Sequence, residues 1–193
     1  MFTRIIIPLA IVLIFSGCAF APQAVLLKPD INIRSGNIGS NKPIILNVID
    51  ERTKTTLGTR TPNMGADLTI EGDIVETVSD SLSKGLLAQG FQITKSANKG
   101  TTKLTELRVE LRALEYRVIT GFWSGTLKTE SAMKGICIVD LLRPYEKLYR
   151  GAHEENILII QTAASNNIYV NIALSQAINN LLSDSSLLKC LAK

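Results

Sequence analysis

The sequence contains little of what most enzyme active sites are built from. Histidine occurs once, at position 153, among 193 residues, and aromatic residues make up only 5% of the chain. There is no Gly-x-Gly-x-x-Gly or phosphate-binding loop and no Gly-x-Ser-x-Gly nucleophile elbow. A zinc site could use His153, but the sequence offers no second ligand at a helical spacing from it. We therefore interpret His153, beside Glu154 and Glu155, as a polar strand edge, and we expect no catalytic residue, no metal and no cofactor.

Cysteine is also scarce, and its spacing is not that of a metal site. None of the three cysteines forms a Cys-x-x-Cys pair. Cys137 lies in an apolar run, a setting that suppresses the reactive thiolate. Cys137 and Cys190 could join in a disulfide if the chain is exported to an oxidising compartment. They could instead be two small buried apolar residues, and we favour this second interpretation.

Charge of one sign is not concentrated anywhere in the chain. The net charge is +4, from 21 Lys and Arg against 17 Asp and Glu, and the basic residues are scattered without runs. A nucleic-acid-binding protein would gather them on one face. The pattern indicates a solvated mixed surface and no nucleic-acid partner.

The N-terminus has the composition of an export signal. Met1 to Arg4 give a short positive start, and Ile5 to Phe15 form an apolar stretch broken only by Pro8. This stretch is shorter than the ~20 residues that a membrane-spanning helix needs. A positive start, a short apolar core and small residues before the cut are typical of a secretory signal. We expect residues 1–17 to be removed. The alternative is an ordinary signal peptide that is cut near Ala19 or Ala21, which would leave Cys18 inert.

The end of this signal resembles the bacterial lipobox, with Phe in place of the usual Leu at its first position: Phe15, Ser16, Gly17 and Cys18. The resemblance implies that Cys18 carries covalent lipid, the only non-protein group expected. Two or more acyl chains anchor a protein stably to a bilayer. Because Ala19 and not Asp follows the cysteine, the resemblance points to the periplasmic leaflet of the outer membrane.

Two segments follow the signal. Residues 18–43, called the lead-in below, contain Pro22, Pro29 and Pro43 among Gly, Ser and Asn, which suits a tether or an extended approach to the domain. Residues 25–27 within it could still pair as a short strand. We expect residues 44–193 to form a single periplasmic domain.

Hydrophobic periodicity predicts the elements of this domain. Residues 44–50 are rich in β-branched side chains and indicate a strand, followed by a polar loop over 51–63. Apolar residues then recur every four positions, which predicts a helix over about 70–90 with a capping Asp73 and a stop at Gly90. A second apolar stripe predicts the last helix over 166–190.

Strict alternation between these helices predicts long strands. Leu107, Val109 and Leu111 share one face, and after residue 113 the apolar set changes parity, which predicts a β-bulge near 112–114. Residues 126–142 follow as a strand that Pro144 ends, with 147–160 as its hairpin partner. The fold class is therefore α+β, a mainly antiparallel sheet with the two amphipathic helices on one side.

The sequence as a whole resembles the YajG family of small bacterial outer-membrane lipoproteins. The matching positions are the residues 50–52 after the first strand, Leu57-Gly58, and Gly90-Phe91 after the first helix. The resemblance implies an α+β periplasmic domain on an outer-membrane lipid anchor, and it implies no reaction.

Two places could contact a partner. Asp50 and Arg52 can form a structural ion pair, which we favour, or bind a partner. Phe122 and Trp123 in the 121–125 turn can form an interface or fold back over the sheet. We expect a non-enzymatic interaction or scaffold module in cell-envelope assembly or maintenance, with an envelope protein as partner. The alternative is a lipid-binding or transporter-auxiliary lipoprotein, suggested by the wide apolar face of the last helix.

Overall fold

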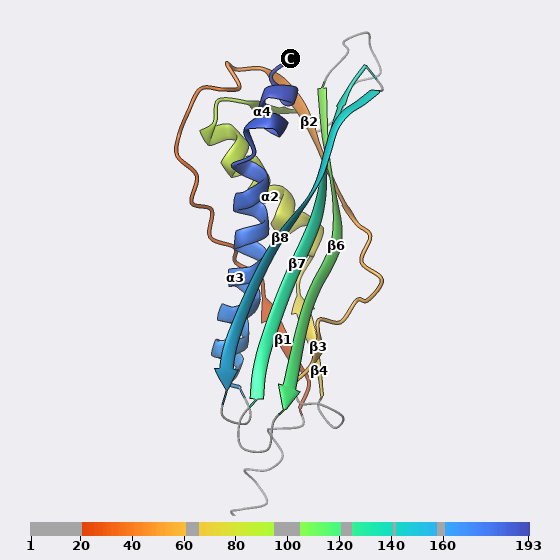
Figure 1. The fold of residues 1–193 in the computed structure, drawn as a ribbon, viewed down its shortest axis with the longest axis vertical. Helices are drawn as coiled ribbons and strands as arrows, with labels where there is room; N and C mark the ends of the chain where they lie inside the picture. The colour runs from red at the N-terminus through yellow and green to blue at the C-terminus, as the bar shows by residue number, and fades with distance from the viewer. Residues whose placement is uncertain (1–20, 61–65, 95–104, 121–124, 141, 158–160) are drawn as a thin grey trace, which may run out of the picture.

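Three long neighbouring strands dominate the fold: β6 (Thr105–Thr120), β7 (Gly125–Val139) and β8 (Leu142–Ile157) (Figure 1). The computed structural model describes residues 21–60, 66–94, 105–120, 125–140, 142–157 and 161–193. The three strands pair antiparallel, as the alternation predicted, and the register shifts between Leu111 and Ala113, where the bulge was expected. Pro144 lies within β8, an edge strand of the main sheet, so it does not end the strand region as predicted. Proline is tolerated on an edge strand because its missing N–H faces away from the sheet.

The other two strands of the main sheet are parallel to β6. Strand β2 (Pro43–Asp50) lies between β6 and β5 (Gln92–Thr94) and pairs parallel with both, giving the order β5-β2-β6-β7-β8. The α+β class is confirmed, and the sheet is mixed rather than antiparallel throughout. The parallel pairing follows from the crossover through α2, which returns the chain to the same end of the sheet before β5.

A second, three-stranded sheet was not predicted, although residues 25–27 were considered for a short strand. The helix predicted from about residue 70 begins only at Ile74, because the residues before it form a strand. The second sheet has the order β1-β4-β3, with β1 (Gln23–Leu26), β3 (Gly58–Thr59) and β4 (Asp67–Glu71). Leu57 joins the two sheets, because its N–H donates to the Leu68 carbonyl at 2.8 Å and its carbonyl accepts from the Tyr116 N–H at 2.7 Å. The small sheet therefore lies along the part of β6 that β2 leaves unpaired.

The helices α2 (Ile74–Ala88), α3 (Ala163–Leu182) and α4 (Ser185–Leu191) cover one side of the main sheet (Figure 1). Asp73 caps α2, with its carboxylate accepting from the N–H groups of Val75 and Glu76, and Gly90 follows the helix at φ +86°. The predicted single helix over 166–190 is two helices, because the Asp184 carboxylate caps the start of α4. The apolar stripe of the last helix faces the core, where these side chains are at most 1% exposed: Val170, Leu174, Ile178 and Leu181.

The described part of the lead-in is packed on the domain. Residues 23–26 form β1, and the segment after them lies along α3, which presents polar side chains at every fourth position. Backbone N–H groups of alternate lead-in residues donate to these side chains in four bonds, which we call the α3 ladder: Leu26 to Asn167 at 3.2 Å, Lys28 to Asn171 at 2.6 Å, Asp30 to Ser175 at 2.8 Å and Asn32 to Asn179 at 3.0 Å. Further along, Gly36 and Gly39 donate to the last carbonyls of α2 and its cap.

The ladder changes the interpretation of residues 18–43. Composition left two alternatives open, a tether and an extended approach to the domain, and the described residues form the second, with a short strand. The physical reason is that an extended chain has one outward N–H every two residues, and α3 supplies acceptors at a matching interval. Composition predicts that such a segment is not a helix, but it does not show what the segment lies against.

Candidate functional site

Two sets of predicted site residues lie outside the described residues. They are the predicted contact residues Phe122 and Trp123, and the lipobox with its predicted lipid-bearing cysteine: Phe15, Ser16, Gly17 and Cys18. The structure does fix the place where the lead-in meets the domain. Strand β1, which begins two residues after the first described residue, starts toward one end of the long axis, and the C-terminus with α4 lies at the other (Figure 1).

A polar cluster, called the Arg60 clamp below, holds this first part of the lead-in. The Arg60 guanidinium donates from Nη1 to the Ala21 carbonyl at 3.1 Å and from Nη2 to the Gln161 carbonyl at 3.2 Å. Beside it, the Asn166 amide donates to Gln23 Oε1 at 2.8 Å. Tyr116 Oη in turn donates to Asn166 Oδ1 at 2.8 Å.

The clamp is built into the core of the domain. Asn166 is fully buried, and burial also raises the pKa of the Tyr116 hydroxyl well above its usual range. A buried amide that loses its partners costs about 1–3 kcal/mol, so these bonds constrain the geometry strongly. No sequence pattern indicates this cluster, because its members come from four segments that are far apart in the chain.

Asp50 and Arg52 form the structural ion pair that the sequence analysis favoured. The Arg52 guanidinium binds the Asp50 carboxylate through two bonds of 2.8 Å, and the Arg52 side chain is only 7% exposed. These hydrogen bonds from Arg52 lower the pKa of the Asp50 carboxyl. Bidentate pairing of this kind fixes the chain as it leaves β2.

The pair also lines a cleft of about 490 Å³ between the end of β2, strand β4 and the start of α2. Asp50 keeps 32% of its side chain exposed there, so its carboxylate can still accept a hydrogen bond from outside. Gly58, another position of the family resemblance, has a backbone role close by. Its φ is +149°, and a Cβ at this position would collide with the Tyr116 carbonyl.

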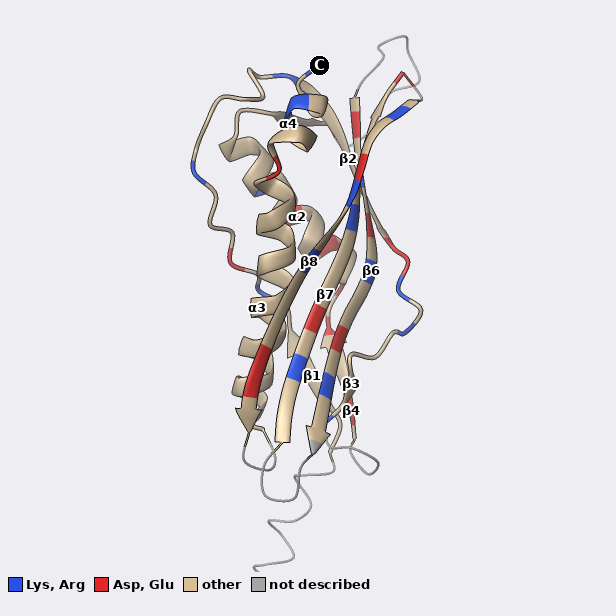
Figure 2. Cartoon of the chain, viewed as in Figure 1, with Lys and Arg blue, Asp and Glu red and all other residues tan. Residues whose placement is uncertain are grey.

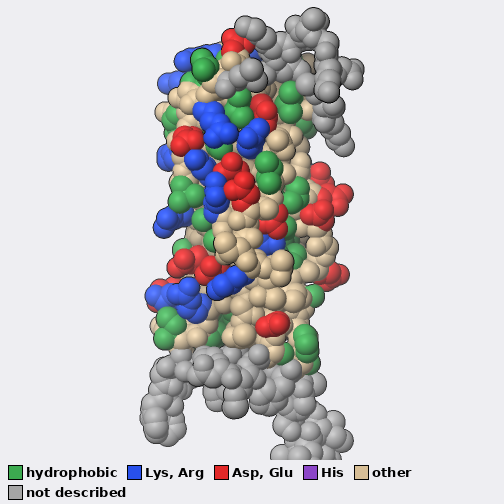
Figure 3. All heavy atoms as spheres, turned by 90° about the vertical axis from the view of Figure 1, so that its right-hand side faces the viewer, with side chains coloured by type: hydrophobic (Ala, Val, Ile, Leu, Met, Phe, Trp, Pro, Cys, Tyr) green, Lys and Arg blue, Asp and Glu red, His purple; other side chains and the backbone are tan. Residues whose placement is uncertain are grey.

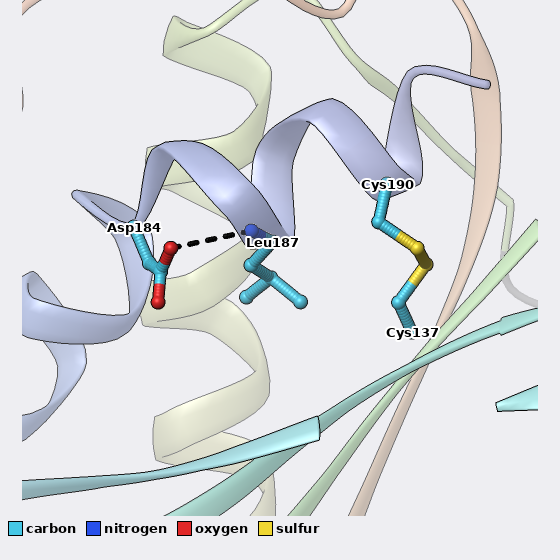
Figure 4. Close-up of a disulfide and its surroundings, with 4 residues drawn as sticks. All are labelled: Cys137, Asp184, Leu187 and Cys190. Carbon is cyan, nitrogen blue, oxygen red and sulfur yellow. Dashed lines mark hydrogen bonds between the residues drawn. A yellow bond between two sulfur atoms is a disulfide. The ribbon is translucent and has the colours of Figure 1, made fainter. Parts of the chain in front are cut away.

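A disulfide joins Cys137 on β7 to Cys190 on α4, with 6.4 Å between the two Cα atoms (Figure 4). The preference for two unpaired buried cysteines was therefore wrong. Sequence spacing could not decide the question, because the contact depends on α4 turning back over the sheet after the break at Asp184. Both cysteines are nearly or fully buried, so the disulfide lies within the core.

Asp184 is the second link between α4 and the sheet. Its carboxylate caps α4 and also accepts from three side chains on β8: Tyr145 Oη at 2.8 Å, Lys147 Nζ at 2.8 Å and Tyr149 Oη at 3.0 Å. Burial alone would raise its pKa, but the bonds from Lys147 and the two tyrosines outweigh burial and hold the pKa far below the ordinary range. This arrangement leaves the carboxylate saturated, which suits a structural role.

His153 lies on β8 and its side chain contacts helix α3. Its ring stacks on Tyr169 of α3 with 5.0 Å between centroids, and Nε2 lies 3.6 Å from the Glu155 carboxylate. Within the described residues, no group of three or more potential metal ligands lies together. His153 was interpreted as part of a polar strand edge. It lies on β8, an edge strand of the main sheet, and its ring packs between that sheet and α3.

The outer face of the sheet carries charge of both signs, as the scattered sequence pattern indicated (Figures 2 and 3). Its charges pair along and between strands, and Arg112, for example, contacts both Glu110 and Glu51. Other pairs on this sheet are Lys128 with Glu154 and Lys134 with Glu146, each at 2.9 Å. Mutual pairing leaves no single-sign surface for a polyanion on the face that Figure 3 shows.

The fold is thus a small α+β domain with its lead-in bound along helix α3. The family profile described as uncharacterized lipoprotein (Lipoprotein_16) matches residues 29–192, and the chain belongs to this family. The membership confirms the lipoprotein resemblance found in the sequence. Within the described residues, no helix is long and apolar enough to cross a membrane. A search of curated proteins found no significant match.

The chain is also similar to solved structures of low sequence identity. A Xanthomonas campestris protein of family DUF330 is 13% identical, with a TM-score of 0.50 over 84% of this chain and 91% of that one. A minor lipoprotein from Acinetobacter baumannii is 11% identical, with a TM-score of 0.47 over 74% of this chain and 85% of that one. These likenesses concern architecture alone.

Proposed function

We propose that this protein is acylated on Cys18, is held on the periplasmic leaflet of the outer membrane, and acts there as a non-enzymatic interaction module in envelope assembly or maintenance. Membership of a lipoprotein family carries the first part of the proposal. The lipobox-like residues that end at Cys18 supply the acylation site. Only Ala19 and Phe20 separate that cysteine from the clamped Ala21.

The contact with a partner is proposed at the Asp50–Arg52 cleft. In the cleft, the buried Arg52 fixes the Asp50 carboxylate while part of that carboxylate stays open to solvent. Threonines 55, 56 and 69 line the same cleft and add hydroxyl groups that can donate or accept. A cleft with these polar groups beside Ile70 and Ile74, at the end of a strand, suits recognition of a protein segment.

The alternative, a lipid-binding accessory, was suggested by the wide apolar stripe of the last helix. That stripe is packed against the sheet in the core, and its central side chains are at most 1% exposed. The observation that motivated the alternative therefore has an ordinary explanation in packing, and we propose the interaction module alone.

The lipid anchor is tested by replacing Cys18 with Ser in the full-length chain. We expect unprocessed or mislocalised protein that no longer floats with outer-membrane vesicles in a density gradient. The matched control is Ser16→Ala, which replaces one small lipobox residue by another beside the cysteine and should be processed and float normally. Normal processing and flotation of Cys18→Ser would contradict the proposal.

The partner contact is tested by photocrosslinking in cells. A crosslinking amino acid at Thr55 or Thr56, in the cleft, should capture one reproducible envelope protein. The same amino acid at Glu154, on the charged outer face, serves as the control and should not capture it. Equal capture from both positions, or none from the cleft with protein correctly anchored, would remove the cleft as the contact site.

A further inference from the structure

The Arg60 clamp and the α3 ladder bind the lead-in to the domain, and this binding affects how the domain is oriented on the membrane. We propose that the lead-in holds the domain in a fixed pose, with the end at Ala21 against the phospholipid surface and the end at α4 pointing away from it. We call these the Ala21 end and the α4 end. The proposal rests on acylation at Cys18, which is the proposed function above.

Several elements meet at the Ala21 end. Strand β6 ends there at Thr120, β7 begins at Gly125, and α3 begins at Ala163 (Figure 1). The α4 end carries the C-terminus and the turn between β7 and β8. Helix α3 alone has 20 residues and spans about 30 Å, so the two ends are separated by at least about that distance.

The clamp removes the freedom that a lipid anchor usually leaves. Ala21 is fixed through its carbonyl by Arg60, and Gln23 is fixed through its side chain by buried Asn166. Beyond them, the α3 ladder holds the lead-in as far as Asn32. No loose segment within residues 21–32 can act as a hinge between the domain and the anchor.

The remaining chain between clamp and lipid is short. Three residue steps from Cys18 to Ala21 can span at most about 11 Å when fully extended. The acyl chains on Cys18 lie in the bilayer, so Ala21 must stay within about that distance of the lipid surface. The Ala21 end is therefore close to the membrane, and the α4 end cannot replace it there.

Among the described residues, exposed apolar side chains do not favour one end over the other. Ile119 and Ile168, near the Ala21 end, are 49% and 57% exposed, but Leu142 near the α4 end is 70% exposed. Judged by the exposed apolar side chains of the described residues alone, the α4 end would suit contact with the membrane as well as the Ala21 end. The inference follows from the clamp and the short reach.

Fluorescence quenching on the acylated full-length chain tests the orientation. A fluorophore is placed by Ile119→Cys or Ile168→Cys at the Ala21 end, and by Leu142→Cys or Lys193→Cys at the α4 end. The protein is reconstituted in vesicles of phosphatidylethanolamine and phosphatidylglycerol that contain lipids with nitroxide headgroups. We expect the nitroxide to quench the first two labels and to leave the last two unquenched. Equal quenching at both ends, or quenching only at the α4 end, would overturn the proposal.

A longer link supplies the control. Inserting about 20 Gly and Ser residues after Ala19 adds a mean span of about 25 Å between anchor and clamp. The quenching at residues 119 and 168 should then be lost while flotation with vesicles is unchanged. Retained quenching would show that the Ala21 end binds lipid by itself, and would overturn the clamp as the cause.

The two proposals fail separately. If the chain is not acylated, it does not float with vesicles, and the proposed function fails before any quenching is measured. If it floats and all four labels are quenched alike, the anchor stands and only the fixed orientation is refuted.

Discussion

Removal of the Cys137–Cys190 disulfide should destabilise the protein by about 4 kcal/mol. The two cysteines are separated by 53 positions, and closing a loop of that length in the unfolded chain lowers its entropy by about 14 cal/mol/K, or about 4 kcal/mol at room temperature. The folded state should lose little packing, because reduction alone deletes no atoms. The expected change is therefore a property of the unfolded chain.

The assay is urea unfolding followed by far-ultraviolet circular dichroism, on a soluble version that begins at residue 19. Oxidised protein is compared with the same protein in excess reductant, so that the two samples differ only in the cross-link. The double variant Cys137→Ala, Cys190→Ala then adds the packing cost of losing two buried sulfur atoms, and it should unfold slightly more easily than reduced wild type.

Two results would refute this expected loss of stability. A change below about 1 kcal/mol would mean that the cross-link does not restrict the unfolded chain as the loop length requires. Unfolding of α4 alone, seen as a separate early transition, would also refute the reasoning, because it would show that the rest of the fold does not depend on this link.

Further predictions concern the polar links. Asp184→Asn should reduce stability at neutral pH and flatten its pH dependence. Folding lowers the Asp184 pKa, so the ionised carboxylate stabilises the folded protein above the unfolded pKa of about 4, and this stabilisation is lost as the pH falls through the folded pKa. Acid titration of the unfolding free energy measures this loss, and the same pH profile in the variant and the wild type would contradict it. Asn171→Ala should cost about 1–2 kcal/mol and increase amide exchange at Lys28, because Asn171 both accepts from Lys28 N–H and donates to the Leu26 carbonyl; unchanged exchange there would be inconsistent with the ladder. Tyr116→Phe should cost about 1 kcal/mol by the same denaturant assay, and no loss would mean that the hydroxyl bond to Asn166 adds nothing net.

Local signals predicted the parts of the fold whose cause is local. The parity change after residue 113 gave β6 and its bulge, because side chains alternate strictly along a strand whatever its partner. Asp73 marked the start of α2, because a capping carboxylate acts on N–H groups two and three residues away. The break before α4 carried a similar signal in Asp184, which the apolar stripe on both sides concealed.

Parts that depend on distant partners could not be predicted in this way. Strand β4 was missed because its partner β1 lies more than forty positions earlier, where Gln23 pairs with Leu68. The ion pair of Asp50 and Arg52 was predicted because the two residues lie on one side of the same chain segment, whereas the Arg60 clamp has no such proximity in sequence. The lipid attachment at Cys18 remains a prediction from sequence pattern alone.

The α3 ladder also depends on a numerical coincidence between two kinds of backbone. Four residues of an α-helix rise about 6.0 Å and turn about 40° beyond a full circle. Two residues of an extended chain advance about 6.6 Å. The ladder can stay in step because the acceptors of α3 wind slowly around the helix, so an oblique path along them is longer than the rise itself.

This matching of intervals has a consequence for how the chain can vary. The lead-in contributes only backbone N–H groups to the four bonds, so its side chains between residues 26 and 32 can change without breaking them. Deleting or inserting a single residue would turn every later N–H to the wrong side, because alternate residues of an extended chain point in opposite directions. The spacing imposed by α3 therefore constrains the length of the lead-in, whereas its composition is constrained by the apolar side chains that reach the core, such as Leu27.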